Sequence, residues 1–295
     1  MEITLENDLL RVTVTTWGGQ LKSVVRKCDG VEHMWSADPD YWDYHAPILF
    51  PHCGPVKDGA FTAKGQRYKA AFHGFSQPME HRVLARGQDF VRLEITDTSE
   101  TYARWPYHFR LETTYTLTGD TVRHSVTIEN RDEEELPFGF GFHPGFAVPF
   151  DDRHTADDYE IRFSQLESPL CIACRGHGGT QSNTLYSLGR NIRSLPLDRT
   201  LFKGPSHCMV NLASTQVSLW EKDTGRRVTC DIAGFPYTLL WTEGRSEKPR
   251  FLCIEPWHSI PSPEEGSDDW ADKPAAEILA PGGVWHTELT VHFAR

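Results

Sequence analysis

Three ionisable side chains of this sequence lie in segments rich in glycine, proline and aromatic residues. They are His73 in His-Gly-Phe (73–75), His143 in Phe-His-Pro-Gly-Phe (142–146) and Glu255 in Ile-Glu-Pro-Trp (254–257). Such surroundings are typical of a rigid, partly apolar pocket, where the loss of water can move a pKa toward the working pH. A histidine and a carboxylate in one pocket can donate and accept protons, so these segments together indicate an acid/base site.

Each of these residues, taken alone, also has a structural explanation. Glu255 follows the apolar run 251–254 and precedes Pro256, which predicts a carboxylate at the end of a buried strand. A structural salt bridge explains it as well as catalysis does. His143 lies in Phe-Gly-Phe-Gly-Phe-His-Pro-Gly-Phe (138–146), whose glycines let a ligand approach the backbone and whose rings suit stacking on a sugar. A lone histidine in such a segment can equally be a core residue.

The elements that must position these residues are predicted to be β-strands. Apolar and polar side chains alternate within residues 3–5, 10–14, 91–95, 111–117, 122–128 and 285–293. Helical periodicity is confined to two short stretches, 38–43 and 264–271, which we expect to be connections. Proline and glycine are spread along the chain and mark no linker. We therefore predict an all-β fold, one large antiparallel β-sandwich domain over residues 1–295.

The charge of the chain makes nucleic acid an unexpected partner. With 41 acidic and 30 basic residues, its formal net charge of −11 repels polyanions. No segment resembles a secretion signal, and no apolar run is long enough to span a membrane. We therefore predict a cytoplasmic protein without a membrane partner.

The cysteines and histidines give no metal or redox motif. The seven cysteines are an odd, scattered set, which is typical of reduced thiols, and Cys171-x-x-Cys174 has no second pair at zinc spacing. The 14 histidines form no His-x-His pair, so a metal-dependent β-barrel enzyme would require metal in the purified protein. A glycosidase would need a second carboxylate, and no position matches that of Glu255. We expect no metal and no cofactor.

In their order and spacing the motifs resemble the aldose 1-epimerase, or galactose mutarotase, family. The resemblance runs nearly from end to end and is greatest to a bacterial epimerase-like branch with the segment Ala-Pro-Ile-Leu-Phe-Pro (46–51). The other matching segments are Trp-Ser-Ala-Asp (35–38), Tyr-Trp (41–42), Lys-Asp-Gly (57–59), Gly-x-x-Tyr (65–68), His-Gly-Phe (73–75), Gly-Phe-His-Pro-Gly-Phe (141–146), Ile-Glu-Pro-Trp (254–257) and Ile-Pro (260–261).

This resemblance implies a galactose mutarotase-like supersandwich that holds a sugar in an open cleft on one sheet, without a cofactor. Glu255 would take the proton of the anomeric hydroxyl while His143 protonates the ring oxygen, so that the ring opens and recloses as the other anomer. His73 would bind a sugar hydroxyl or support the acid. We also expect Phe142 and Trp257 to contact the sugar, and the protein to be a monomer or a homodimer.

Two substrate-binding positions of the family differ in this chain. Many relatives have an arginine where this chain has Pro55, and Lys57, two residues on along an extended segment, is expected to bind the sugar instead. The family's acidic residue after a later Leu-Phe is missing, because residues 201–202 lead into Lys-Gly-Pro-Ser-His (203–207). These differences leave a second hypothesis open, a non-catalytic sugar-binding or sugar-sensing protein on the same fold.

Overall fold

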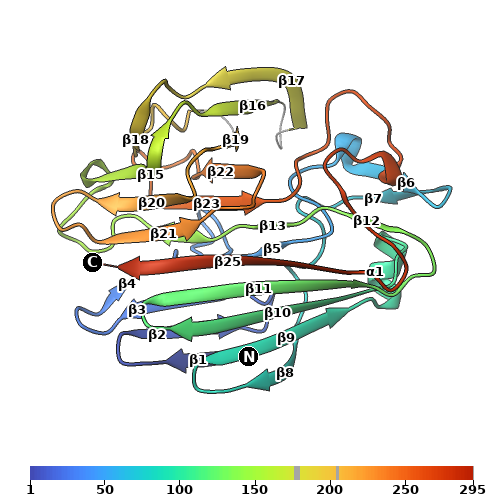
Figure 1. Cartoon of the computed structure of the whole chain (residues 1–295), viewed down its shortest axis with the longest axis horizontal. Coiled ribbons are helices and arrows are strands. Elements are labelled where there is room, and N and C mark those ends of the chain that lie inside the picture. Colours follow the sequence, from blue (N-terminus) through green and yellow to red (C-terminus); the bar gives the residue numbers. More distant parts are fainter. Residues whose placement is uncertain (176–179, 204–205, 295) are drawn as a thin grey trace.

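The computed structural model describes residues 1–175, 180–203 and 206–294, and two large antiparallel sheets dominate it (Figure 1). The first sheet has nine strands. From one edge to the other they are β18 (Ile192–Pro196), β15 (Tyr159–Glu167), β20 (Gln216–Glu221), β21 (Arg227–Asp231), β25 (Val284–Ala294), β11 (Thr121–Asn130), β10 (Phe109–Thr118), β9 (Phe90–Thr96) and β8 (Arg82–Arg86).

The second large sheet carries the central strand β23. Its order is β17 (Thr180–Ser187), β16 (Leu170–Arg175), β19 (His207–Val210), β22 (Tyr237–Trp241), β23 (Phe251–Trp257), β13 (Gly141–Phe142) and β5 (Ile48–Leu49). A further short strand, β14 (Gly145–Ala147), pairs with β23 beyond the end of β13.

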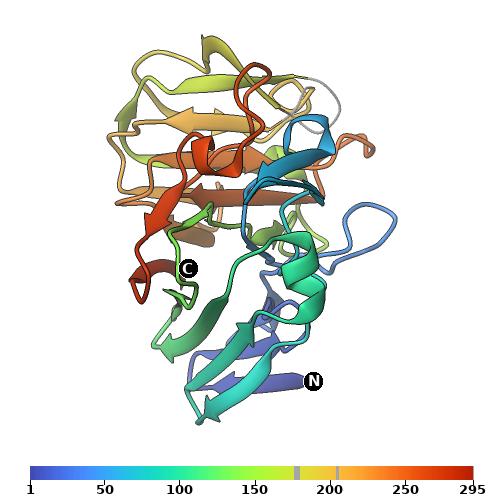
Figure 2. The same cartoon turned by 90° about the vertical axis from the view of Figure 1, so that its right-hand side faces the viewer.

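Three smaller sheets complete the β-structure. One has the order β1 (Glu2–Glu6), β2 (Leu10–Thr15), β3 (Leu21–Arg26) and β4 (Val31–Glu32). The other two are the pairs β6 (Ala60–Ala63) with β7 (Gln66–Lys69) and β12 (Leu136–Phe138) with β24 (Glu277–Leu279). The β6–β7 hairpin lies beside the 3₁₀ turn η3 (Trp270–Asp272) at one end of the molecule (Figure 2).

A single hydrophobic cluster joins the two layers of the sandwich. Leu289, Val291 and Phe293 of β25 belong to it, and so do Leu252 and Ile254 of β23. These are alternate residues of their strands, as expected where one face of a strand packs on a core. The predicted all-β antiparallel sandwich is confirmed, and the alternation predicted for 285–293 corresponds to β25.

The two short stretches with helical periodicity are connections, as expected, and neither forms an α-helix. Residues 38–43 form a turn in which the backbone N–H groups of Tyr41 and Trp42 both donate to the carbonyl of Asp38. Of residues 264–271, only the end enters η3. Segments this short seldom form helices, because nucleation is costly and few hydrogen bonds follow.

A short helix that was not predicted, α1 (Ser99–Arg104), begins after the capping residue Thr98. The remaining 3₁₀ turns are η1 (Lys57–Gly59) and η2 (Ala156–Asp158). None of the helices in the described ranges has the length and apolar character that crossing a membrane requires.

The two faces of β23 have different surroundings, and the site lies on the face that points away from the sandwich core. Leu252 and Ile254 point into the sandwich core, whereas Phe251, Cys253, Glu255 and Trp257 point to the other side of the sheet. All seven residues of β23 are buried. Small aromatic and thiol-containing clusters therefore cover the outer face of this sheet.

Buried histidines make the stability of this fold dependent on pH. Burial lowers the pKa of His124 to about 3 and the pKa values of His33 and His81 to about 4. Below the unfolded value near 6.5 the unfolded chain therefore binds more protons than the folded one. Stability is full above that pH and falls as the pH drops toward 4, by up to about 1.4 kcal/mol per pH unit for each histidine.

Urea unfolding at several pH values checks this expectation. His124→Phe, which keeps a ring against Tyr115, should make the loss of stability on acidification smaller, while the same change at the exposed His286 serves as the control. A free energy of unfolding that stays constant from neutral pH to about pH 5 would show that these histidines do not make stability depend on pH.

Candidate active site

The pairing of β23 with β13 and β14 sets His143 across from Glu255. The paired residues are Gly141 with Trp257 and Gly145 with Cys253. The same antiparallel register, continued through the residues between these pairs, places His143 opposite Glu255. The Cβ atoms of directly opposed residues lie about 4.5–5.5 Å apart on the same face. Accordingly, Nε2 of His143 is 3.2 Å from Oε2 of Glu255.

This pair is withdrawn from water. His143 is 6% exposed and Glu255 is 1% exposed. Desolvation lowers the pKa of His143 to about 3 and raises the pKa of Glu255 well above its ordinary value of 4.5. Both shifts favour the uncharged forms, a carboxyl group and a neutral imidazole. Together the two side chains then hold one titratable proton, which is on the carboxyl group.

Each member of the pair also has one unsatisfied polar atom. Within the described residues, Oε1 of Glu255 and Nδ1 of His143 are buried without a hydrogen-bond partner. A buried polar atom without a partner costs about 1–3 kcal/mol. A structural salt bridge would be expected to satisfy them.

Aromatic rings enclose the imidazole of His143. Trp42 stacks on it, with ring centroids 4.9 Å apart and an interplanar angle of 29°. Trp241 and His73 approach the imidazole edge-on, at centroid distances of 5.7 Å and 5.4 Å. The loop carrying Trp42 is held by Trp35, whose indole N–H donates to the Trp42 carbonyl at 2.8 Å. These contacts fix the imidazole and exclude water from it.

Two glycines of the 138–146 segment make room for this packing. A Cβ atom on Gly145 would lie 2.6 Å from Cζ3 of Trp42, and one on Gly141 would lie 2.4 Å from Cδ1 of Trp257. Real Cβ contacts are longer, so only glycine fits at either position. These glycines were expected to let a ligand approach the backbone, but tryptophan rings fill the space.

His73 comes to the site on a strained turn. His73 and Gly74 both have positive φ angles, 62° and 80°, and a Cβ on Gly74 would lie 2.2 Å from the Phe50 carbonyl oxygen. The backbone N–H of Gly54 donates to Nδ1 of His73 at 2.9 Å. Burial lowers the pKa of His73 well below 6.5, and the nearby His143 adds to this. The ring is therefore neutral, with its proton on Nε2 available as a donor.

The structure brings Trp257 to the pair but turns the ring of Phe142 away. Trp257 is on the face of Glu255, with its ring edge-on to His73 at 5.8 Å, and its indole N–H donates to the Phe142 carbonyl at 3.2 Å. The ring of Phe142 belongs to the sandwich core and lies 4.8 Å from that of His124. The Phe142 ring therefore packs in the sandwich core beneath the site, away from His143 and Glu255.

Lys57 is placed differently from His73 and Trp257. It begins η1, and its Nζ lies 3.7 Å from Oδ1 of Asp268. No contact in the described part of the chain joins it to His143 or Glu255. The second divergent segment, 203–207, contains Gly204 and Pro205, which lie outside the described residues.

Three neighbours of the pair were not predicted as site residues: Trp42, Trp241 and Cys253. Alternation along 251–257 was a signal for Cys253, because a residue two positions before Glu255 shares its face. Trp241 lies across from Cys253 on β22. The strand was expected to end at Glu255, before Pro256. Instead β23 continues through Pro256, so Glu255 lies inside the strand.

Two groups of side chains in the described ranges could hold a metal ion. One consists of His143, Cys253 and Glu255, and the other of Asp151, His154 and Glu221. In each group the ligand atoms lie within 4.8 Å of one another.

Comparison with known proteins extends the similarity over the whole chain. The family model for aldose 1-epimerase matches residues 1–269. The chromosomal LacX protein of Lactococcus lactis subsp. lactis is 31% identical over 290 residues, covering 95% of both chains. The plasmid LacX protein of the same subspecies is 32% identical over 291 residues, again covering 95% of both.

Solved structures show the same fold. A galactose mutarotase related enzyme from Lactobacillus acidophilus has a TM-score of 0.94 at 24% identity, covering 100% of this chain and 98% of that one. A galactose mutarotase-like protein from Lactobacillus casei ATCC 334 has a TM-score of 0.90 at 28% identity, covering 99% of each chain. The resemblance found in the motifs is confirmed, and this chain belongs to the aldose 1-epimerase family.

Proposed function

We propose that this protein is an aldose 1-epimerase, which interconverts the α and β anomers of an aldohexose or a related sugar. The observation that carries the proposal is the buried contact between His143 and Glu255, with one unsatisfied polar atom on each residue. Ring opening removes a proton from the anomeric hydroxyl and adds one to the ring oxygen. Both oxygens are bonded to the anomeric carbon, so a donor and an acceptor in contact can serve both.

The electrostatics of the pair suit these two proton transfers. Burial makes the Glu255 carboxylate a stronger base, because its pKa is raised, and the His143 imidazolium a stronger acid, because its pKa is lowered. With a sugar bound, the pair's proton resides on His143 and Glu255 is the base. Ring opening moves one proton onto Glu255 and one from His143 to the sugar, which returns the pair to its uncharged form. Reclosure on the other face reverses both transfers.

The neighbouring groups have supporting roles in this proposal. The Nε2–H of His73 is a donor for a sugar hydroxyl, since Nδ1 is taken by Gly54. The Trp241 and Trp257 rings lie on the same side of the sheet as Glu255 and provide apolar surface against a sugar face.

Conservative changes of the pair test the proposed mechanism. Glu255→Gln and His143→Asn should each slow anomer exchange by roughly 10²–10⁴-fold, because each removes one proton-transfer group. Polarimetry and saturation-transfer NMR on freshly dissolved sugars measure the rate. Thermal stability should be retained in Glu255→Gln, whereas breaking a buried structural salt bridge costs about 3–5 kcal/mol.

The matched control is Glu112→Gln, which neutralises a carboxylate paired with Arg92 and Arg110 on the nine-stranded sheet. It should leave the exchange rate unchanged. A wild-type protein that accelerates no sugar in a broad panel of hexoses and hexose phosphates would contradict the proposal. Tight sugar binding by calorimetry that Glu255→Gln does not alter would instead favour the sugar-binding or sugar-sensing hypothesis.

The dependence of kcat/KM on pH is a separate test, because the pair must hold one proton. A second proton is taken up only near the lowered pKa of His143, about 3. The one proton is lost only well above the ordinary glutamate value of 4.5. We therefore expect constant activity across the weakly acidic range, with a single alkaline decrease. An acidic decrease with a midpoint near 6.5, the ordinary histidine value, would contradict this expectation.

Gly145→Ala tests the role of the Trp42 ring. The added Cβ would overlap Cζ3 of Trp42 and displace the ring from His143. We expect anomer exchange to slow by about 10- to 100-fold, since small misplacements of catalytic groups have effects of this size. Near-ultraviolet circular dichroism should report the moved indole. The control is Gly244→Ala, where nothing lies within 4 Å of the new atom. Equal exchange rates in the two variants would exclude a role of the Trp42 ring in anomer exchange.

A further inference from the structure

A thiol lies beside the proposed acid/base pair and shares its face of the sheet. Cys253 precedes Glu255 by two residues on β23, so both side chains project toward the imidazole of His143. The sulfur, the carboxylate oxygen and the imidazole nitrogen lie within 4.8 Å of one another, and all three residues are buried. Imidazole nitrogen, thiolate sulfur and carboxylate oxygen are the ligands that Zn²⁺ takes in proteins, at about 2.0–2.3 Å from the metal.

The existing contacts of these side chains leave a carboxylate oxygen free to bind a cation. Oε1 of Glu255 has no hydrogen-bond partner within the described residues, so the carboxylate has an oxygen to give to a metal. Among the ion pairs of the described chain, Glu255 has only His143 as its partner, and no lysine or arginine is paired with it. A thiolate and a carboxylate together would neutralise a divalent ion, and three protein ligands leave one tetrahedral position open.

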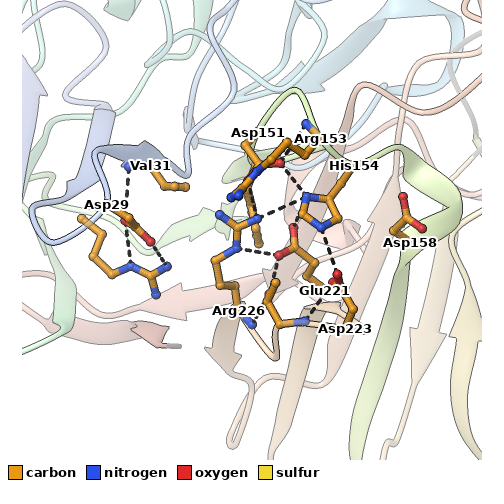
Figure 3. A network of polar contacts seen from close by, with 12 residues as sticks. Asp29, Val31, Asp151, Arg153, His154, Asp158, Glu221, Asp223 and Arg226 are labelled. Carbon is orange, nitrogen blue, oxygen red and sulfur yellow. Dashed lines mark hydrogen bonds and ion pairs between the residues drawn. The ribbon is translucent and has the colours of Figure 1, made fainter.

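The second candidate group, around Glu221, lacks these properties. Arg226 already donates through Nε to Glu221 and through a terminal nitrogen to Asp151 at 2.7 Å (Figure 3). His154 contacts Asp151 through Nδ1 and Asp223 through Nε2. Arg226 is only 3% exposed, so a metal ion would have to displace a buried guanidinium. This network therefore joins the segment at Asp151 to the β20–β21 hairpin and excludes a cation.

We propose that His143, Cys253 and Glu255 form an inhibitory site for a soft divalent cation such as Zn²⁺ or Cd²⁺. The proposal rests on the proposed function, since two of the three ligands are the suggested acid and base. On binding, the thiol of Cys253 and the carboxyl group of Glu255 each release a proton to solvent, and the metal takes the imidazole and carboxylate lone pairs that proton transfer needs. Metal and sugar therefore weaken each other's binding reciprocally.

Titration with Cd²⁺ alone tests the site without any substrate. In buffer free of chelators and added thiols, one equivalent of Cd²⁺ should produce the ultraviolet charge-transfer absorption of a cadmium–thiolate bond. Cys253→Ser and Cys253→Ala should abolish this band, and Glu255→Gln should weaken Cd²⁺ binding by about tenfold or more. Cys230→Ser changes an equally buried thiol in the sandwich core and should leave the band intact.

The outcomes separate this inference from the proposed function. Absence of the band, or a band that persists in both Cys253 variants, overturns the metal site whatever the activity. In active protein, Zn²⁺ should slow anomer exchange, and added sugar should raise the Zn²⁺ concentration needed. Inhibition that survives Cys253→Ser also overturns the inference. A Cd²⁺ band that depends on Cys253 in a protein without exchange activity supports the metal site while the proposed function fails.

Discussion

The antiparallel pairing of β23 with β13 and β14 determines the geometry of the site. It sets His143 opposite Glu255 and, through strand alternation, sends Leu252 and Ile254 into the sandwich core. A shift of this pairing by one residue would exchange the two faces of β23 and place Glu255 among the core side chains. The hydrophobic core therefore enforces the contact between imidazole and carboxylate, although neither belongs to it.

The position of the pair between two apolar clusters explains the shifted pKa values of its two members. Trp35 and Phe251 belong to the cluster on one side, and Leu239 and Trp257 to the cluster on the other. Their burial removes water from the carboxylate and the imidazole, which makes one a stronger base and the other a stronger acid. The same burial leaves polar atoms unsatisfied. Such a site is less stable than an apolar one would be.

Much of this arrangement could be predicted from the sequence, because it depends on local patterns. Alternation predicted strands such as β25, and the surroundings of His143 and Glu255 marked both as candidates. The stacking of Trp42 could not be predicted, because the ring reaches His143 from an irregular loop whose path depends on distant contacts. The role of Gly145 was misread for the same reason, since the sequence does not show which ring fills the space beside it.

In the free protein the buried pair holds a single titratable proton, and His143 is uncharged. Nitrogen NMR of labelled protein, with the signals of His143 assigned by comparison with His143→Asn, measures this charge directly. We expect a neutral imidazole from neutral pH down through the ordinary histidine pKa of 6.5, because burial lowers its pKa to about 3. An imidazole that becomes protonated with a midpoint near 6.5 would contradict it.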